Sequence, residues 1–188
     1  GGLWENMYQH QWNANDIYFY NVWKYLFKVI VLSNQSLSII DSHRNLLSDQ
    51  QASAFSAEVR AIRALFYYYA MDMFGRIPIV TSYNVNLGQV VQNERSEVFR
   101  FIFNELQAVA PLLADEHSNI RGDYYGRVTR PVVNFLLAKL ALNAEVYTVD
   151  NWTSGSRQNG KNIFFHVNGE KKNAWETCIW YCEQLRQE

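Results

Sequence analysis

Apolar residues recur at spacings of three and four along most of this chain, which is the period of a helix that buries one face. Five stretches show the pattern, over residues 16–40, 48–75, 96–113, 129–147 and 173–185. In the second stretch the neighbouring side of the helix is apolar as well, so this helix is expected to lie between two others. The pattern predicts an all-α domain of stacked antiparallel helical hairpins.

Residues with special backbone preferences mark the expected helix ends. Ser48 and Gln51 have the spacing of a capping box, and Asp16 is placed to cap the start of the first helix. Gly75 occupies the position where a left-handed glycine usually ends a helix. Pro111 lies inside the last turn of the third helix and predicts a kink or an early end there.

A loop rich in Gly, Ser and Asn, residues 149–172, separates the last two helices. Within it, residues 163–167 are followed by Asn168 and Gly169, a pair typical of tight hairpin turns, so a short β-hairpin is expected. Residues 155–162 approximate a phosphate-binding loop, but the last position lacks the hydroxyl that would bind magnesium and a helix, not a strand, precedes it. We therefore expect no cofactor.

Composition narrows the classes of function. A net charge of −1 argues against a nucleic-acid partner, which normally requires a concentrated basic face. The four histidines show no metal-ligand spacing, and Cys178 and Cys182, one helical turn apart, are expected to pack in the core. The chain contains no nucleophile elbow, zinc-protease motif or dinucleotide fingerprint, so we expect a protein without enzymatic activity.

Several conspicuous side chains are expected to have structural roles. Trp23 and Trp175 lie on apolar stripes, which predicts that both are in the core. Glu58, Arg60 and Arg63 lie in a helix that is otherwise apolar. Because charged side chains are rarely buried without partners, these three are expected to form ion pairs that brace neighbouring helices.

The second helix and its exit carry a longer motif. Residues 58–65 read E-V-R-A-I-R-A-L, and residues 74–79 read F-G-R-I-P-I after an aromatic run. This resembles the signature of the SusD/RagB family. Residues 22–40, 95–106 and 126–147 resemble three further stretches of the family in the right order, and the final helix looks like the one that follows, so the resemblance covers residues 16–188.

The resemblance implies a tetratricopeptide-like scaffold in a nutrient-binding lipoprotein of Bacteroidetes, exposed on the outer membrane. It implies capture of glycans without bond cleavage, and delivery of the glycan to a TonB-dependent transporter of the SusC type. We expect residues 1–188 to form the N-terminal helical domain of such a protein, with the C-terminal portion of the family absent. Membrane association would depend on a lipid anchor that is also absent, since the lipidated N-terminal cysteine is missing.

Aromatic residues outside the helices are the best candidates for ligand contacts. Residues 3–13 precede the first helix, show no clear period and mix rings with amides, and the resemblance implies that sugar-contacting residues lie on such loops. We therefore predict that Trp4, Asn6, Trp12 and the loop residue Trp152 contact the ligand. Two alternatives remain open: these residues pack against irregular structure, or the segment is a docking scaffold whose ligand is contacted mainly by the missing C-terminal part. Trp180 is expected to dock against that part.

Overall fold

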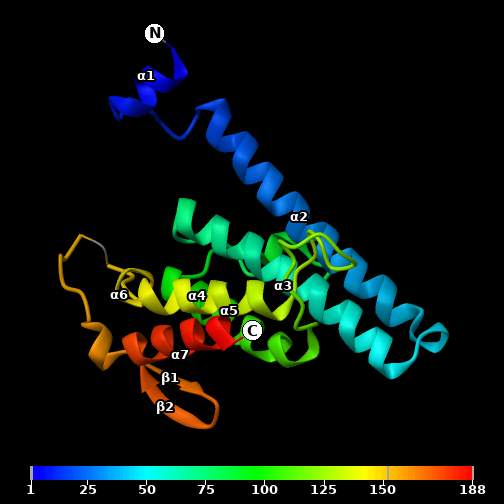
Figure 1. Ribbon diagram of the computed structural model, residues 1–188. Coiled ribbons are helices and arrows are strands. Elements are labelled where there is room, and N and C mark those ends of the chain that lie inside the picture. Colours follow the sequence, from blue (N-terminus) through cyan, green and yellow to red (C-terminus); the bar gives the residue numbers. More distant parts are fainter. Residues whose placement is uncertain (1, 152, 188) are drawn as a thin grey trace.

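The computed structural model describes residues 2–151 and 153–187, and most of them are helical (Figure 1). The α-helices are α1 (Leu3–Tyr8), α2 (Ile17–Ser42), α3 (Asp49–Phe74), α4 (Arg95–Val109), α5 (Arg130–Leu142), α6 (Ala144–Tyr147) and α7 (Ala174–Gln187). A two-stranded antiparallel sheet is formed by β1 (Phe164–Val167) and β2 (Glu170–Asn173). The prediction of an all-α class with one short hairpin is confirmed.

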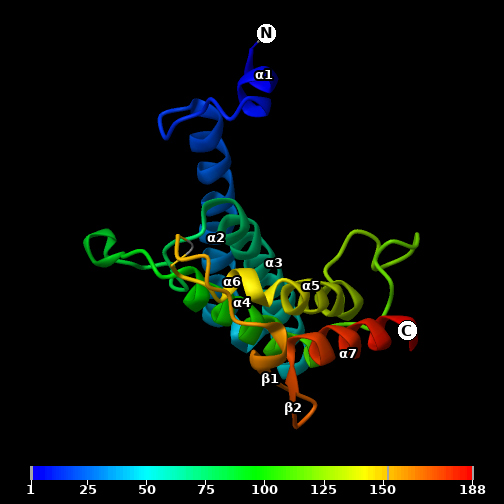
Figure 2. The same cartoon turned by 90° about the vertical axis from the view of Figure 1, so that its left-hand side faces the viewer.

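The helices pack in pairs along a single core. The long helices α2 and α3 run antiparallel, and α3 also packs against α4 on its other side, so the predicted burial of α3 from two sides is confirmed. Helix α5 packs against α4 and α7, and the hairpin lies beside α7 (Figures 1 and 2). The short helix α1 stands apart from this stack at the start of α2 in both views. No helix in the described part of the chain is both long and apolar enough to cross a membrane.

Two of the predicted helix ends are confirmed and one is wrong. The Ser48 hydroxyl accepts a hydrogen bond from the Gln51 N–H at 3.2 Å, and the Gln51 side chain accepts one from the Ser48 N–H at 3.0 Å, which completes the capping box. Gly75 has a φ of 71° and ends α3 as expected. Asp16 stands at the N-cap of α2, but its carboxylate accepts from the N–H of Asn13 at 3.0 Å, so it stabilises the preceding turn and not the helix.

The hairpin follows its turn residues. Asn168 and Gly169 have φ values of 52° and 77°, the left-handed conformation that a two-residue turn of this kind requires. Val167 pairs with Glu170 next to the turn, which sets the register of both strands. The predicted β-hairpin is therefore confirmed.

Elsewhere the chain departs from the helices expected from its pattern. Residues 3–8 form helix α1, although no helical period was found there. The stretch 129–147 was expected to be one helix, but it breaks at Asn143, whose side chain donates to the carbonyl of Lys139 at 2.9 Å. A side chain that bonds to the backbone in this way competes with helix continuation. Helix α4 ends at Val109, before Pro111, and so confirms the expected early end.

Helix α7 is rotated relative to its expected orientation. Its buried positions are Ala174, Thr177 and Tyr181, so the prediction that Trp175 is in the core is wrong: this side chain is 39% exposed. Its indole packs instead on the loop at Gly160, where an added Cβ would collide with the ring, and the Lys161 ammonium lies 5.5 Å from the ring centroid. The contact with the loop at Gly160 thus helps to decide which side of α7 faces the core.

The rotation of α7 also changes how far its two cysteines are buried. Cys178 is half-buried and Cys182 is exposed, so core packing is wrong for Cys182. Both are free thiols. Burial and the neighbouring Cys182 raise the pKa of the Cys178 thiol to about 11, so this thiol is protonated at neutral pH and is a poor nucleophile.

The charged residues of α3 form ion pairs with other segments, as predicted. Arg60 donates to both carboxylate oxygens of Glu105 on α4, at 2.6 and 3.1 Å. Arg63 donates to the same carboxylate at 2.9 Å and to the side-chain oxygen of Asn34 on α2 at 2.8 Å. Glu58 pairs with Arg127 at 2.6 Å. Helices α2, α3 and α4 are therefore joined by one polar network inside an apolar core.

Candidate functional site

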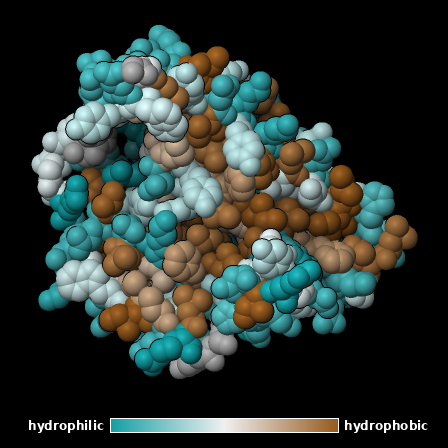
Figure 3. Space-filling model, turned by 45° about the horizontal axis from the view of Figure 1, so that its top comes forward, coloured by the Kyte–Doolittle hydropathy of each residue, from teal (hydrophilic) through white to brown (hydrophobic). Residues whose placement is uncertain are grey.

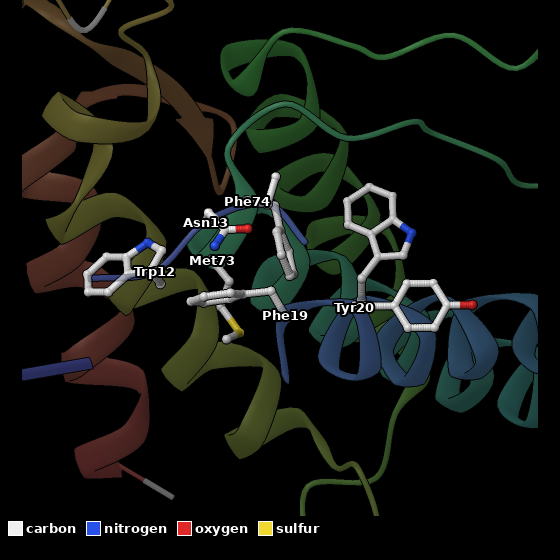
Figure 4. A pocket seen from close by; sticks show the side chains of 8 residues that line it. Trp12, Asn13, Phe19, Tyr20, Met73 and Phe74 are labelled. Atoms are coloured by element: carbon white, nitrogen blue, oxygen red, sulfur yellow. The ribbon is translucent and has the colours of Figure 1, made fainter. Parts of the chain in front are cut away.

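An open pocket of about 640 Å³ lies where the N-terminal segment meets the start of α2 and the end of α3 (Figure 4). The residues that line it come from these three segments and carry no formal charge: Trp12, Asn13, Ala14, Phe19, Tyr20, Trp23, Met73 and Phe74. Five of the eight are aromatic. We call this site the aromatic pocket.

The core fixes the inner wall of the aromatic pocket. The ring of Trp23 packs against Phe27 with centroids 4.4 Å apart, and edge-on against Phe74 at 5.1 Å. Trp23 was predicted to be in the core; it is half-buried and packs against the core, and part of its surface lines the pocket. Because Gly75 ends α3 directly after Phe74, the last turn of α3 stops at the pocket.

The outer wall of the aromatic pocket is more exposed. Trp12 is 44% exposed, and its ring lies 4.9 Å from that of His10 and 6.0 Å from that of Phe19. Tyr20 is 60% exposed, and in the close view it stands across the pocket from Trp12 (Figure 4). The pocket thus combines a rigid inner wall with two exposed rings that a ligand can reach.

The polar groups of the aromatic pocket are few and uncharged. The side-chain oxygen of Asn13 accepts from the N–H of Asn15 at 2.9 Å, which leaves the amide NH2 group of Asn13 available as a donor. The phenol of Tyr20 can both donate and accept. Flat apolar rings with a small number of hydrogen-bonding groups suit a neutral ligand that has apolar faces and hydroxyl edges.

The lining side chains of the aromatic pocket include no carboxylate, imidazole or thiol. Among residues 2–151 and 153–187, no group of three histidine, cysteine or acidic side chains is placed to hold a metal ion. The arrangement supports binding by contact.

The structure brings two of the four predicted contact residues together. Trp12 lines the aromatic pocket, and it also lines a hollow of about 130 Å³ together with Asn6, between α1 and the start of α2. Trp4 lies on α1, is 80% exposed and belongs to the lining of neither site. Trp152 lies outside the described residues. Ligand contact by all four residues stays a prediction.

The remaining lining residues were not identified from the sequence. Asn13 and Tyr20 flank the predicted Trp12, but Met73 and Phe74 lie more than fifty positions further along the chain. A signal for the last two was present, because both precede the glycine that ends α3 and therefore lie at an end of the helix. The predicted antiparallel hairpin places this end of α3 beside the start of α2, but the pattern could not show that the side chains line one pocket with Trp12.

Comparison with known proteins agrees with this architecture. The model of a SusD-like family, described as starch-binding and associating with the outer membrane, matches residues 2–142. The starch-binding protein SusD of Bacteroides thetaiotaomicron is 33% identical over 102 residues, which are 54% of this chain and 17% of that protein. The chain therefore spans less than a fifth of this curated relative in the matched region.

Solved structures show the same fold. A SusD superfamily protein from Parabacteroides distasonis matches with a TM-score of 0.65 and 26% identity, over 76% of this chain and 30% of that one. A crystal structure with xylogluco-oligosaccharide matches with a TM-score of 0.70 and 21% identity, over 95% of this chain and 31% of that one. Because the family model covers well over half of the residues and the ordered motifs agree with it, the chain belongs to the SusD/RagB family.

Proposed function

We propose that this chain binds extracellular glycans through the aromatic pocket. The observation that carries the proposal is the lining itself: five aromatic rings, one of them the exposed phenol of Tyr20, and the amide of Asn13 surround about 640 Å³ without a formal charge. Sugars present apolar C–H faces edged by hydroxyl groups, so they pack against such rings while their hydroxyls bond to the amide and the phenol.

The relatives support a glycan as the ligand class. Their names refer to starch, to laminarin and to a xylogluco-oligosaccharide, which are all carbohydrates. This chain spans about a third or less of the length of those proteins, so the agreement concerns a segment of each and the specific glycan is open.

We further propose that the protein acts without catalysis at the cell surface. The family is described as associating with the outer membrane, which supports that location. A binding protein placed there would deliver its glycan to a TonB-dependent transporter of the SusC type. The lining of the aromatic pocket includes no pair of carboxylates of the kind that glycosidases use, which supports binding there without hydrolysis.

A second function, that of a helical docking scaffold, is favoured by the exposed apolar surface. Figure 3 shows apolar side chains gathered in a broad band on one face of the molecule. Large apolar residues with more than half of their surface exposed include Tyr25 and Ile39 on α2, and Phe135 and Leu142 on α5. Exposed apolar surface of this kind often marks a contact with further polypeptide. If the chain is a docking scaffold, the ligand is bound mainly by residues outside this segment.

Replacing Trp12 with alanine in the full chain distinguishes the two functions. Affinity electrophoresis against starch, laminarin and xyloglucan should show binding by the parent protein, and a loss of affinity of about tenfold or more in Trp12→Ala, because an exposed aromatic platform is removed. Tyr125→Ala is the control, since Tyr125 is an aromatic residue in a different loop, outside the aromatic pocket, and is more exposed than Trp12, at 66% against 44%.

Two results would contradict the glycan-binding proposal. Unchanged affinity in a folded Trp12→Ala variant would favour the docking scaffold, and the triple replacement of Trp4, Trp12 and Trp152 extends this comparison to every predicted tryptophan contact. Failure to bind any glycan, together with binding of peptides, would overturn the ligand class. Prolonged incubation with oligosaccharides should yield no shortened products, and their appearance would contradict the non-catalytic role.

A further inference from the structure

A second pocket, of about 460 Å³, lies beside the aromatic pocket around the turn that follows α3. The two pockets share Met73 and Phe74 as lining residues, so they meet at the last turn of this helix. The second pocket is polar where the first is aromatic. Its lining includes three carboxylates, two guanidinium groups and one carboxamide, from Asp72, Glu94, Asp150, Arg76, Arg95 and Gln92. We call it the polar pocket.

Half of these groups are held by bonds within the protein. The Asp150 carboxylate accepts from the backbone N–H of Ser96 at 2.9 Å and from its hydroxyl at 2.7 Å. Arg95 donates to the carbonyl of Val149 at 2.7 Å. Asp72 accepts from the hydroxyl of Tyr147 at 2.7 Å. These bonds join the last turn of α3 and the start of α4 to α6 and the segment that follows it, and so they give the polar pocket fixed walls.

Glu94 caps the start of α4 in a capping box with Glu97, but Arg76 and Gln92 are loosely held. Arg76 lies 3.5 Å from Glu94, with side chains 55% and 44% exposed. Gln92 donates to the carbonyl of Arg76 at a long distance of 3.4 Å. An exposed ion pair at such a distance contributes little to stability, so Arg76 can turn toward a ligand at small cost. Arg76 and Gln92 are therefore the groups that can bond to hydroxyls in the pocket.

The side chains between the two pockets form only a small barrier to a ligand. Met73 is 54% exposed, and the unbranched thioether of methionine adapts to what lies against it. Gly75 lines the polar pocket directly beyond, and the position that a Cβ would take there is empty, with no atom within 4 Å. A ligand that fills the aromatic pocket can thus continue over Met73 toward Arg76.

The charges of the lining indicate which glycans fit. Three carboxylates against two guanidinium groups give the polar pocket a net charge of −1, and the aromatic pocket has none. A uronic acid in either pocket would meet no excess of positive charge and would face net repulsion in the polar one. Neutral sugars can use both the donors and the acceptors.

We propose that the polar pocket is a second glycan subsite, which holds the continuation of a neutral oligosaccharide bound in the aromatic pocket. This inference rests on the proposed function and deepens it. It predicts that the protein distinguishes glycans by length and charge: units beyond the aromatic pocket contact Arg76 and Gln92, and anionic chains are disfavoured.

Calorimetry on the full chain tests this subsite with defined sugars. The probes are maltose and maltohexaose, laminaribiose and laminarihexaose, and hexagalacturonate as the anionic chain. In the series that binds, Arg76→Ala should weaken the hexasaccharide about tenfold and the disaccharide by less than about twofold, since a charged donor is lost only from the longer complex. Gln92→Ala should also weaken binding of the hexasaccharide more than that of the disaccharide, with a smaller loss of affinity than in Arg76→Ala. Arg121→Ala, an exposed arginine outside both pockets, is the control and should change neither affinity.

The outcomes separate this inference from the proposed function. Equal losses for both lengths in Arg76→Ala, or no loss for the hexasaccharide, would overturn the subsite while Trp12→Ala still reports on the aromatic pocket. Tighter binding of hexagalacturonate than of the neutral hexasaccharides would overturn the preference for neutral chains. If the parent protein bound none of these sugars, and bound none of starch, laminarin and xyloglucan in affinity electrophoresis, both the subsite and the proposed function would be overturned.

Discussion

Replacing Glu105 with glutamine is expected to lower the free energy of unfolding of the full chain by about 3 kcal/mol. Glu105 is 17% exposed and is shared by Arg60 and by Arg63, whose side chain is only 6% exposed. The glutamine keeps the shape of the side chain but removes its charge. Arg63 is then left charged in a largely apolar interior, and this uncompensated burial is the source of the loss. Urea unfolding of both proteins measures the difference.

A matched control for this substitution is Glu116→Gln. Glu116 is exposed in the loop between α4 and α5, so the same chemical change there should alter stability by less than about 0.5 kcal/mol. A decrease below about 1 kcal/mol in Glu105→Gln would show that the network holds the helices in place without stabilising the fold.

The stability that Glu105 provides should also depend on pH. Burial by itself raises the pKa of this carboxyl, but the hydrogen bonds and charges of Arg60 and Arg63 outweigh burial and lower the pKa below its ordinary value of 4.5. A carboxyl with a lowered folded pKa stabilises fully above its unfolded pKa and loses this effect as the pH falls through the folded value. The difference in stability between the parent and Glu105→Gln should therefore be constant above pH 4.5 and shrink below it. A difference that grows in acid would contradict this assignment.

The parts of the fold that could be predicted depend on local signals. The capping box at Ser48 and Gln51, the left-handed Gly75 and the turn at Asn168 and Gly169 each act within a few residues, so the sequence reports them directly. The rotation of α7 is different in kind. It depends on the contact between Trp175 and the loop at Gly160, which the period of the helix alone cannot reveal.

The candidate site also combines residues that local signals reveal with residues that only the packing of distant segments reveals. Trp12 could be selected because an aromatic residue outside a helical period lies near amides. The predicted antiparallel hairpin and the helix end at Gly75 place Met73 and Phe74 near the start of α2, but the pattern does not show that their side chains line one pocket with Trp12. Likewise, the pattern predicted ion pairs for Arg60 and Arg63, but their partner lies over forty residues away and became evident only when α4 was placed against α3.

One aromatic side chain joins the C-terminal elements to the rest of the core. Phe103 on α4 is 2% exposed and stacks on Phe165 of β1 with ring centroids 4.3 Å apart. Its ring also meets Tyr181 of α7 edge-on, with centroids at 6.4 Å. Since Phe103 contacts both the hairpin and α7, its loss should loosen these two elements first.

Phe103→Ala is therefore expected to destabilise the full chain by about 3–5 kcal/mol, the usual cost of a cavity left by a buried phenylalanine. Hydrogen exchange should show earlier opening of β1 and α7 than of the α2–α3 pair, because only the first two lose a direct contact with the ring. Phe164→Ala is the control: the same deletion at a residue of β1 that is 50% exposed should cost less than about 1 kcal/mol. Equal costs at both positions, or uniform opening of all helices, would show that the C-terminal elements are held by contacts other than this aromatic cluster.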